Sequence, residues 1–318
     1  MKSYQPLSLF LLLFFWLNIG FGQSKQSFNK LINETNQYLE RYANLSPFET
    51  EAFISLDQSG LPKKHIQDLK THYQQYEGYS KDSISEYNLL LEFQGLIVEN
   101  LTHIIAHEKF QDNQVEELIS QESDLSIVVS NDRKLYNFSL AEKTGGTYRS
   151  RISITHYTGD SVPPNLKSKD DPEIINQHHV FEGDGFDGIY TIETEQETMY
   201  VLTGYVSGCS SCFEYNLMLV SLNEGLFEVD FSYGISTRFP EEGGIDYNPS
   251  TKTIVVDYVT DDLTSDCYCL NYAEMSEVAD DYHFADGQEL RAKKCHCTFE
   301  FNGSNFELIK ESWEKVKE

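Results

Sequence analysis

Residues 298–309 read Thr-Phe-Glu-Phe-Asn-Gly-Ser-Asn-Phe-Glu-Leu-Ile, and this stretch decides the fold of the C-terminal part of the chain. Apolar and polar side chains alternate on both sides of Asn302-Gly303. Asn-Gly between two alternating runs is the strongest short-range signal of a β-hairpin, because both residues tolerate the positive φ of a tight turn. The stretch therefore predicts two antiparallel strands, 298–301 and 306–309.

The same two-residue period extends back to Leu125, with turn residues every 8–12 positions. This spacing is typical of antiparallel β structure. Many short strands in sequence favour a sandwich or a propeller-like meander. The further strands predicted in this part are 126–129, 134–138, 148–154, 189–192, 199–202, 215–220, 227–231, 245–247 and 253–258.

Residues 23–120 carry a helical period and no convincing strand. A long helix is predicted to begin at Asp82-Ser83-Ile84 and to bury one apolar stripe, formed by Leu90, Phe93, Ile97, Leu101 and Ile104. We expect three or four helices here. The sequence thus predicts an α+β fold, with a helical region at residues 23–122 followed by an antiparallel β domain at residues 123–318.

The first 22 residues have the composition of a secretory signal peptide. A single Lys2 precedes an apolar run from about Pro6 to Leu17, and small residues follow at Gly20 and Gly22. The run is shorter than the roughly 20 residues that span a bilayer, although an uncleaved anchor is the alternative. We expect cleavage before Gln23, a secreted or periplasmic location and no membrane insertion after cleavage.

Acidic residues dominate the charge. The chain has 51 Asp and Glu against 24 Lys and Arg, and without Lys2 the mature balance is 23 − 51 = −28. Such a charge repels phosphate backbones, so nucleic-acid binding is not expected. The 20 Tyr and 20 Phe residues are too many for a disordered acidic chain, so the mature protein is expected to fold.

Six cysteines fall into three close pairs, Cys209/Cys212, Cys267/Cys269 and Cys295/Cys297. A Cys-x-Cys on a strand places both sulfurs on one face, since side chains alternate. If the last two pairs lie on neighbouring antiparallel strands, Cys269 opposes Cys295 and Cys267 opposes Cys297. The sequence therefore predicts these two disulfides, and a third that closes Cys209 on Cys212 across a tight turn.

Two alternatives remain for the cysteines. The four sulfurs of the Cys-x-Cys pairs, with His296, could bind zinc, although Cys-x-Cys suits a zinc knuckle less well than Cys-x-x-Cys. Cys209 and Cys212 could form a redox pair, although no helix follows them to lower a thiol pKa. The oxidising compartment favours disulfides.

Other candidate chemistry is weaker. Acidic loop residues could bind Ca²⁺ but lack the EF-hand spacing, so solvated turns are favoured; they are Asp184, Asp187, Asp261 and Asp262. His103 and His107 lie one turn apart without the Glu of a zinc-protease motif. No other motif points to a cofactor, and none is expected.

One motif carries a resemblance. Ser130-Asn131-Asp132, Tyr136-Asn-Phe-Ser139 and Thr144-Gly-Gly-Thr-Tyr148 together resemble a pattern in uncharacterised exported proteins of Bacteroidota. In that group a Ser-x-Asp turn leads into a strand and then into Thr-Gly-Gly-Thr. The resemblance implies export and a β-rich C-terminal part, and it implies no activity.

Two functions are compatible with these patterns. The first is a non-catalytic binding module that recognises a protein or a glycan. The alternative is a secreted hydrolase that uses two acidic loop residues on a glycan or an ester; the candidates for this pair are Asp184, Asp187, Asp257, Asp261 and Asp262. Because no motif carries catalysis, the sequence favours the binding module.

Overall fold

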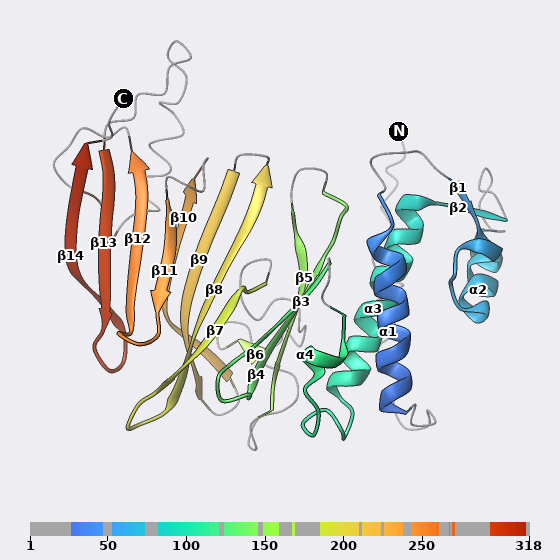
Figure 1. The fold of residues 1–318 in the computed structure, drawn as a ribbon, viewed down its shortest axis with the longest axis horizontal. Helices are drawn as coiled ribbons and strands as arrows, with labels where there is room; N and C mark the ends of the chain where they lie inside the picture. The colour runs from blue at the N-terminus through green and yellow to red at the C-terminus, as the bar shows by residue number, and fades with distance from the viewer. Residues whose placement is uncertain are drawn as a thin grey trace, which may run out of the picture.

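The computed structural model shows a helical layer followed by a stack of β-sheets (Figure 1). Several predicted features lie outside the described residues, namely the leader at residues 1–22, Asp184, Asp261, Asp262 and the side chains of Cys209 and Cys212. The described residues are 27–46, 53–73, 82–120, 124–145, 149–158, 167–168, 185–209, 212–223, 226–237, 243–260, 267, 269–270 and 293–315.

The helical layer is built around α3, which packs along α1. The predicted apolar stripe is confirmed, since none of its five side chains is more than 1 % exposed. This stripe follows the helical period and therefore forms one continuous buried face. The helical elements are α1 (Phe28–Ala43), the 3₁₀ turn η3 (Leu56–Gln58), α2 (Lys63–Tyr73), α3 (Glu86–Ile105) and α4 (Val115–Leu118).

The start of α3 differs from the prediction. The helix begins at Glu86, and the hydroxyl of Ser85 accepts a hydrogen bond from the backbone N–H of Asn88 at 3.2 Å. A serine at this position satisfies one of the free N–H groups of the first turn. Ser85, and not the Asp82-Ser83-Ile84 run, is therefore the cap of this helix.

Residues 83–85 instead form a strand, so the prediction of no strand between residues 23 and 120 is wrong. Strand β2 (Ser83–Ser85) pairs antiparallel with β1 (Phe53–Ser55), and Ile54 lies opposite the buried Ile84. Each strand has three residues. A period of two cannot be recognised over so short a run, which explains why the sequence pattern missed this pair.

The predicted β strands are all present and form three sheets. The first has the order β3-β4-β5, the second β6-β10-β9-β8-β7, and the third β11-β12-β13-β14. All pairs are antiparallel except β10 with β6, so the predicted α+β, mostly antiparallel fold is confirmed. The strands are β3 (Leu125–Val129), β4 (Leu135–Ala141), β5 (Arg151–Tyr157), β6 (Lys167–Ser168), β7 (Gly188–Glu193), β8 (Thr198–Cys209), β9 (Cys212–Asn223), β10 (Leu226–Thr237), β11 (Gly244–Asn248), β12 (Thr253–Thr260), β13 (Lys293–Phe301) and β14 (Phe306–Lys315).

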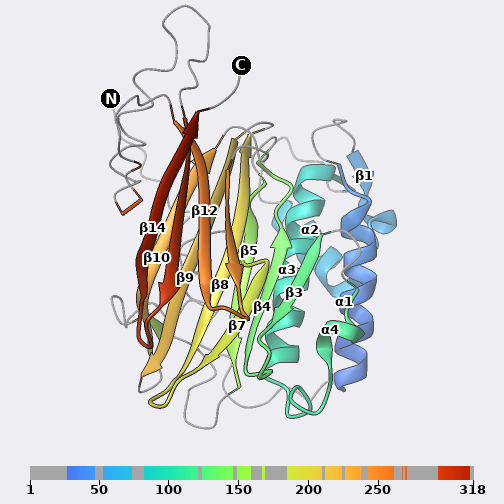
Figure 2. The same ribbon diagram turned by 60° about the vertical axis from the view of Figure 1, so that its left-hand side comes forward.

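The central five-stranded sheet contributes to an apolar core on each of its two faces. On β8, Met199 and Val201 join a core with β12, β13 and β14, while Tyr200 and Leu202 join a core with the three-stranded sheet. Successive side chains of a strand point to opposite faces, so one strand supplies both cores. Figure 2 shows the resulting order of layers, from the helices through the three-stranded and five-stranded sheets to the four-stranded sheet.

A third core joins the helices to the first sheet. Tyr136, Phe138 and Leu140 on β4 belong to the same buried cluster as Phe93 and Ile97 on α3. This cluster extends from Phe28 to Ile154 and so crosses residue 122. The helices and strands β3–β5 thus share one apolar core. The division of the chain into two separate domains at residue 122 stays a prediction.

Candidate functional site

Two disulfides fix the inner side of the four-stranded sheet. Cys267 is bonded to Cys295 and Cys269 to Cys297, with Cα–Cα distances of 5.7 and 5.8 Å. All four cysteines are at most 1 % exposed and lie in the core between this sheet and the central sheet. The prediction of disulfides at these four cysteines is confirmed, but the predicted pairing of Cys269 with Cys295 and Cys267 with Cys297 is wrong.

The order of pairing follows from the position of β13 within its sheet. β13 is hydrogen-bonded to β12 on one side and β14 on the other, so Cys267 and Cys269 cannot lie on a further strand beside it. Cys267 and Cys269 instead lie against the inner face, toward which Cys295 and Cys297 point. The backbone N–H of Cys267 donates to Oε1 of Glu311 on β14 at 2.6 Å.

The zinc alternative does not fit this geometry. The sulfurs of the two pairs are consumed in disulfides, and His296 points to the opposite face of β13 from its neighbours Cys295 and Cys297. Within the described ranges, no group of three or more His, Cys, Asp or Glu side chains could hold a metal ion. The redox alternative concerns Cys209 and Cys212, whose backbones face each other in the β8–β9 register.

The opposite side of the four-stranded sheet carries a row of charged side chains. Nδ1 of His296 lies 2.6 Å from Oδ1 of Asp257, and Nε2 lies 3.7 Å from Oε1 of Glu314. Nζ of Lys294 lies 3.6 Å from Oδ2 of Asp257. We call this side the outer face; the strand registers place on it Val255, Asp257, Lys294, His296, Thr298, Lys310, Ser312 and Glu314.

Asp257, His296 and Ser312 lie directly opposite one another on three neighbouring strands. These are the residue types of a hydrolytic triad, in which the second ring nitrogen of the histidine accepts the serine proton. Here the second nitrogen of His296 faces the carboxylate of Glu314. An imidazole with a carboxylate near each ring nitrogen does not match the arrangement of a triad. Asp257, His296 and Glu314 instead form a cross-strand row of ionisable side chains, which we call the charge ladder.

Asp187, one of the predicted acidic candidates, has a structural role. Arg151 on β5 approaches its two carboxylate oxygens at 3.0 and 3.5 Å. Oδ2 of Asp187 also accepts the backbone N–H of Tyr205 on β8 at 3.0 Å, and Arg151 donates to the Tyr205 carbonyl at 2.7 Å. The two side chains thus complete the backbone hydrogen bonds of β8 beyond the end of β7, where Gly188 pairs with Thr203.

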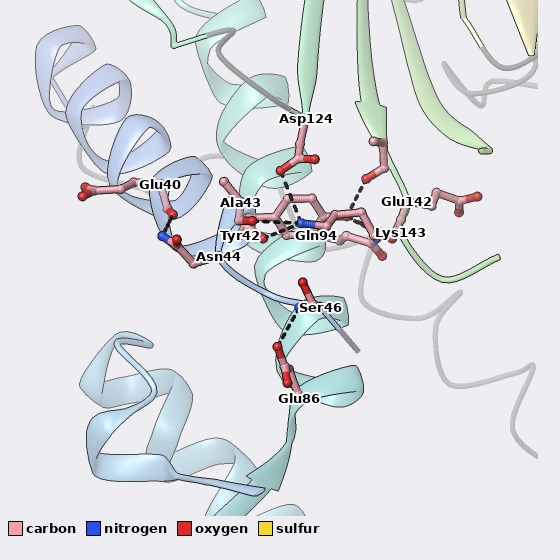
Figure 3. Close-up of polar contacts among 11 residues, drawn as sticks. Glu40, Tyr42, Ala43, Asn44, Ser46, Glu86, Gln94, Asp124, Glu142 and Lys143 are labelled. Atoms are coloured by element: carbon pink, nitrogen blue, oxygen red, sulfur yellow. Dashed lines mark hydrogen bonds and ion pairs between the residues drawn. The ribbon is translucent and has the colours of Figure 1, made fainter. Parts of the chain in front are cut away.

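A buried polar cluster connects the helices to the first sheet (Figure 3). Gln94 on α3 donates to the hydroxyl of Tyr42 on α1 at 2.9 Å, and that hydroxyl donates to the carbonyls of Ala141 and Glu142. Nζ of Lys143 donates to the Tyr42 carbonyl at 3.0 Å and lies 5.1 Å from the centre of its ring. Burial raises the pKa of Tyr42 above its ordinary value, so the phenol stays protonated and acts as a structural link.

A second polar link joins the first sheet to the central sheet. Oδ2 of Asp132 accepts the hydroxyl of Tyr200 at 2.9 Å, and Oδ1 accepts the hydroxyl of Ser130. Burial, with the Asp132 carboxylate as the next cause, raises the pKa of Tyr200. Ser130 and Asp132 belong to the Ser-x-Asp turn of the sequence motif, so this motif positions a contact between sheets.

The remaining histidine candidates do not form a pair. α3 ends at Ile105, so His107 lies beyond the helix that carries His103. Nδ1 of His107 accepts the backbone N–H of Lys109 at 3.1 Å, and its ring packs on Phe28. This arrangement agrees with a structural role.

Sequence reasoning identified several of these side chains but not the residues that they contact. Alternation along residues 293–301 already separates His296 from the cysteines, because neighbouring strand residues face opposite sides. The same alternation places Lys294 on the face of His296. It could not place Glu314 there, because an irregularity opposite Thr298 and Phe299 shifts the register of β14 by one residue. Tyr42, Gln94 and Lys143 carried no local signal, since their contacts cross about 50 to 100 residues of chain.

Comparison of the chain with protein-family models, with curated protein sequences and with solved structures finds no match. In the described part of the chain, no helix has the length and apolar character that crossing a membrane requires.

Proposed function

We propose that the protein is an exported, non-catalytic interaction module that binds a protein partner through the outer face. Export is supported by the predicted leader and by the two disulfides, which persist in oxidising compartments. The observation that carries the proposal is the charge ladder Asp257–His296–Glu314 on the exposed side of a sheet whose inner side is held by disulfides.

A rigid sheet with side chains of both signs at fixed spacing suits recognition of a complementary surface. Arrays of this kind fix orientation and exclude wrong partners, because like charges brought together across an interface are unfavourable. Val255, which is 39 % exposed in the middle of the same face, supplies apolar area beside the charges. The mixture of signs favours a protein surface over a neutral glycan as the partner.

The alternative of a hydrolase is less well supported. Catalysis by a carboxyl pair needs one acid whose pKa is raised so that it remains protonated. The two described candidates each contact other side chains, Asp187 that of Arg151 and Asp257 those of Lys294 and His296. Both carboxylates therefore serve contacts within the protein, which supports the binding module over the hydrolase.

Site-specific photocrosslinking tests the proposal. A photoreactive phenylalanine at Thr298, in the middle of the outer face, is expected to crosslink one partner in the exported fraction of the native host. The matched control carries the same group at Gln37, an exposed position on α1. The crosslink at Thr298 should be competed by unlabelled wild-type protein and be weakened in Asp257→Lys.

Equal labelling from Thr298 and Gln37, or labelling insensitive to Asp257→Lys, would contradict this use of the outer face. Binding to a glycan array that depends on Asp257 would replace the protein partner with a glycan. Ester or glycoside hydrolysis that is lost in His296→Ala would instead support the hydrolase.

A further inference from the structure

Strand β14 is a long strand at one end of the four-stranded sheet, as far as the described residues show. It has ten residues, longer than the five or six that are usual for a strand. The other end of the sheet, β11, lies against β9 and β10 of the central sheet. Among the described strands none pairs with the far side of β14. Figure 1 shows β14 at the outer end of the stack.

Two large apolar side chains are exposed on this edge strand. Ile309 is 56 % and Trp313 is 50 % exposed. An exposed edge with apolar side chains attracts another strand, and proteins commonly block such an edge with charges. The signs of the charges on β14 therefore decide whether this edge repels or selects a second strand.

The charge pattern of β14 is complementary to that of a second, antiparallel copy of the same strand. Lys310, Ser312 and Glu314 follow one another on the outer face, with opposite signs at equal distances from the serine. If two copies of the strand pair antiparallel about Ser312, Lys310 of each copy lies opposite Glu314 of the other. A blocking edge would carry like charges, which repel in every register. The side chain of Glu314 is 69 % exposed and so can reach a second strand.

We propose that β14 is the interface for a second copy of this chain, paired antiparallel about a two-fold axis through Ser312. The pairing joins two four-stranded sheets into one continuous sheet and forms two symmetry-related pairs between Lys310 and Glu314. On the other face it places Trp313 opposite Glu311 of the second copy. Since each chain carries a formal net charge of −27, close approach depends on these two attractive pairs.

Charge exchange tests this pairing. Lys310→Glu and Glu314→Lys each place like charges opposite one another twice, so each variant alone should dimerise at least tenfold more weakly than wild type in sedimentation equilibrium. An equimolar mixture of the two variants should recover the dimer as a heterodimer, because every opposed pair is then Glu against Lys. The double variant should also recover it.

Glu300→Lys is the control, because Glu300 is exposed on β13 and away from the edge. It should leave the dimer unchanged, and circular dichroism should show that all variants are folded. A wild-type protein that is monomeric at several hundred micromolar would overturn the proposal. Failure of the mixture to recover the dimer lost by the single variants would overturn this register of pairing.

Discussion

The hydroxyl of Tyr200 on β8 donates to Oδ2 of Asp132, 68 residues earlier in the chain, across the boundary between two stacked sheets. Tyr200 is fully buried, so its polar group needs this partner. The Ser-x-Asp turn between β3 and β4 therefore serves the packing of the central sheet as well as the turn itself.

Tyr200→Phe is expected to lower the free energy of unfolding by about 1.5–3 kcal/mol, the range for a hydrogen bond to a charged group. The substitution keeps the aromatic ring and removes the hydroxyl that donates to Asp132. Urea unfolding followed by fluorescence measures it. Tyr87→Phe, at a 42 % exposed position on α3, is the matched control and should change stability by less than about 0.5 kcal/mol.

Gly185 occupies a position that excludes any side chain. Its φ is +96°, and a Cβ would overlap Oγ of Ser139. Next to it, Oδ1 of Asn137 accepts the backbone N–H of Phe186 at 3.1 Å, so the backbone must approach the strand closely. Gly185→Ala should destabilise the protein by more than about 2 kcal/mol, from strain and displaced packing together.

Gly95→Ala is the control for this prediction. Gly95 lies within α3 and a Cβ there meets no atom within 4 Å. Alanine in a helix is more favourable than glycine by about 0.5–1 kcal/mol, so this variant should be slightly more stable than wild type. Equal effects of the two substitutions on the urea midpoint would show that the close approach at Gly185 is misplaced.

Buried tyrosines make stability sensitive to alkaline pH. Burial raises the pKa of Tyr247 to about 12, with Tyr190 as a further cause. An unfolded tyrosine loses its proton near pH 10. The stabilisation linked to this group is fully present below about pH 10 and is lost as pH rises through about 12, because the unfolded state then binds fewer protons.

Urea midpoints measured from pH 8 to 12 should therefore fall above about pH 10. Tyr42 and Tyr200 contribute in the same direction, since burial raises the pKa of both. Tyr247→Phe should flatten part of the decline. An identical pH dependence in wild type and Tyr247→Phe would count against a half-buried, protonated phenol at this position.

The two disulfides should be found as Cys267–Cys295 and Cys269–Cys297 by mass spectrometry of peptides cleaved without reduction. Each bridge spans 28 positions. The first to close should contribute about 3–4 kcal/mol by restricting the unfolded chain, and the second less. Peptides that join Cys269 to Cys295 would contradict the position of Cys267 and Cys269 against the inner face.

Local patterns in the sequence predicted the strands, the Asn302-Gly303 hairpin and the buried stripe of α3, because each depends on residues close in sequence. The same alternation predicted that Cys295 and Cys297 share a face. It could not predict the order in which Cys267 and Cys269 reach them, since that depends on β12 and β14 occupying both sides of β13.

The contacts between side chains on the outer face were only partly predictable for the same reason. Asp257 was a candidate as an acid and His296 as a zinc ligand, but their contact is made across two strands 39 residues apart in sequence. A pattern within one strand gives the side to which a residue points. The strand that lies beside it is determined by the packing of the whole sheet.

The affinity of the partner crosslinked at Thr298 tests the central claim most directly. Calorimetry should show that Asp257→Lys weakens binding at least tenfold, because it reverses a charge in the ladder with His296 and Glu314. Glu40→Lys makes the same change of charge at an exposed position on α1 and should leave the dissociation constant unchanged. Equal dissociation constants for wild type and Asp257→Lys would contradict recognition through the outer face.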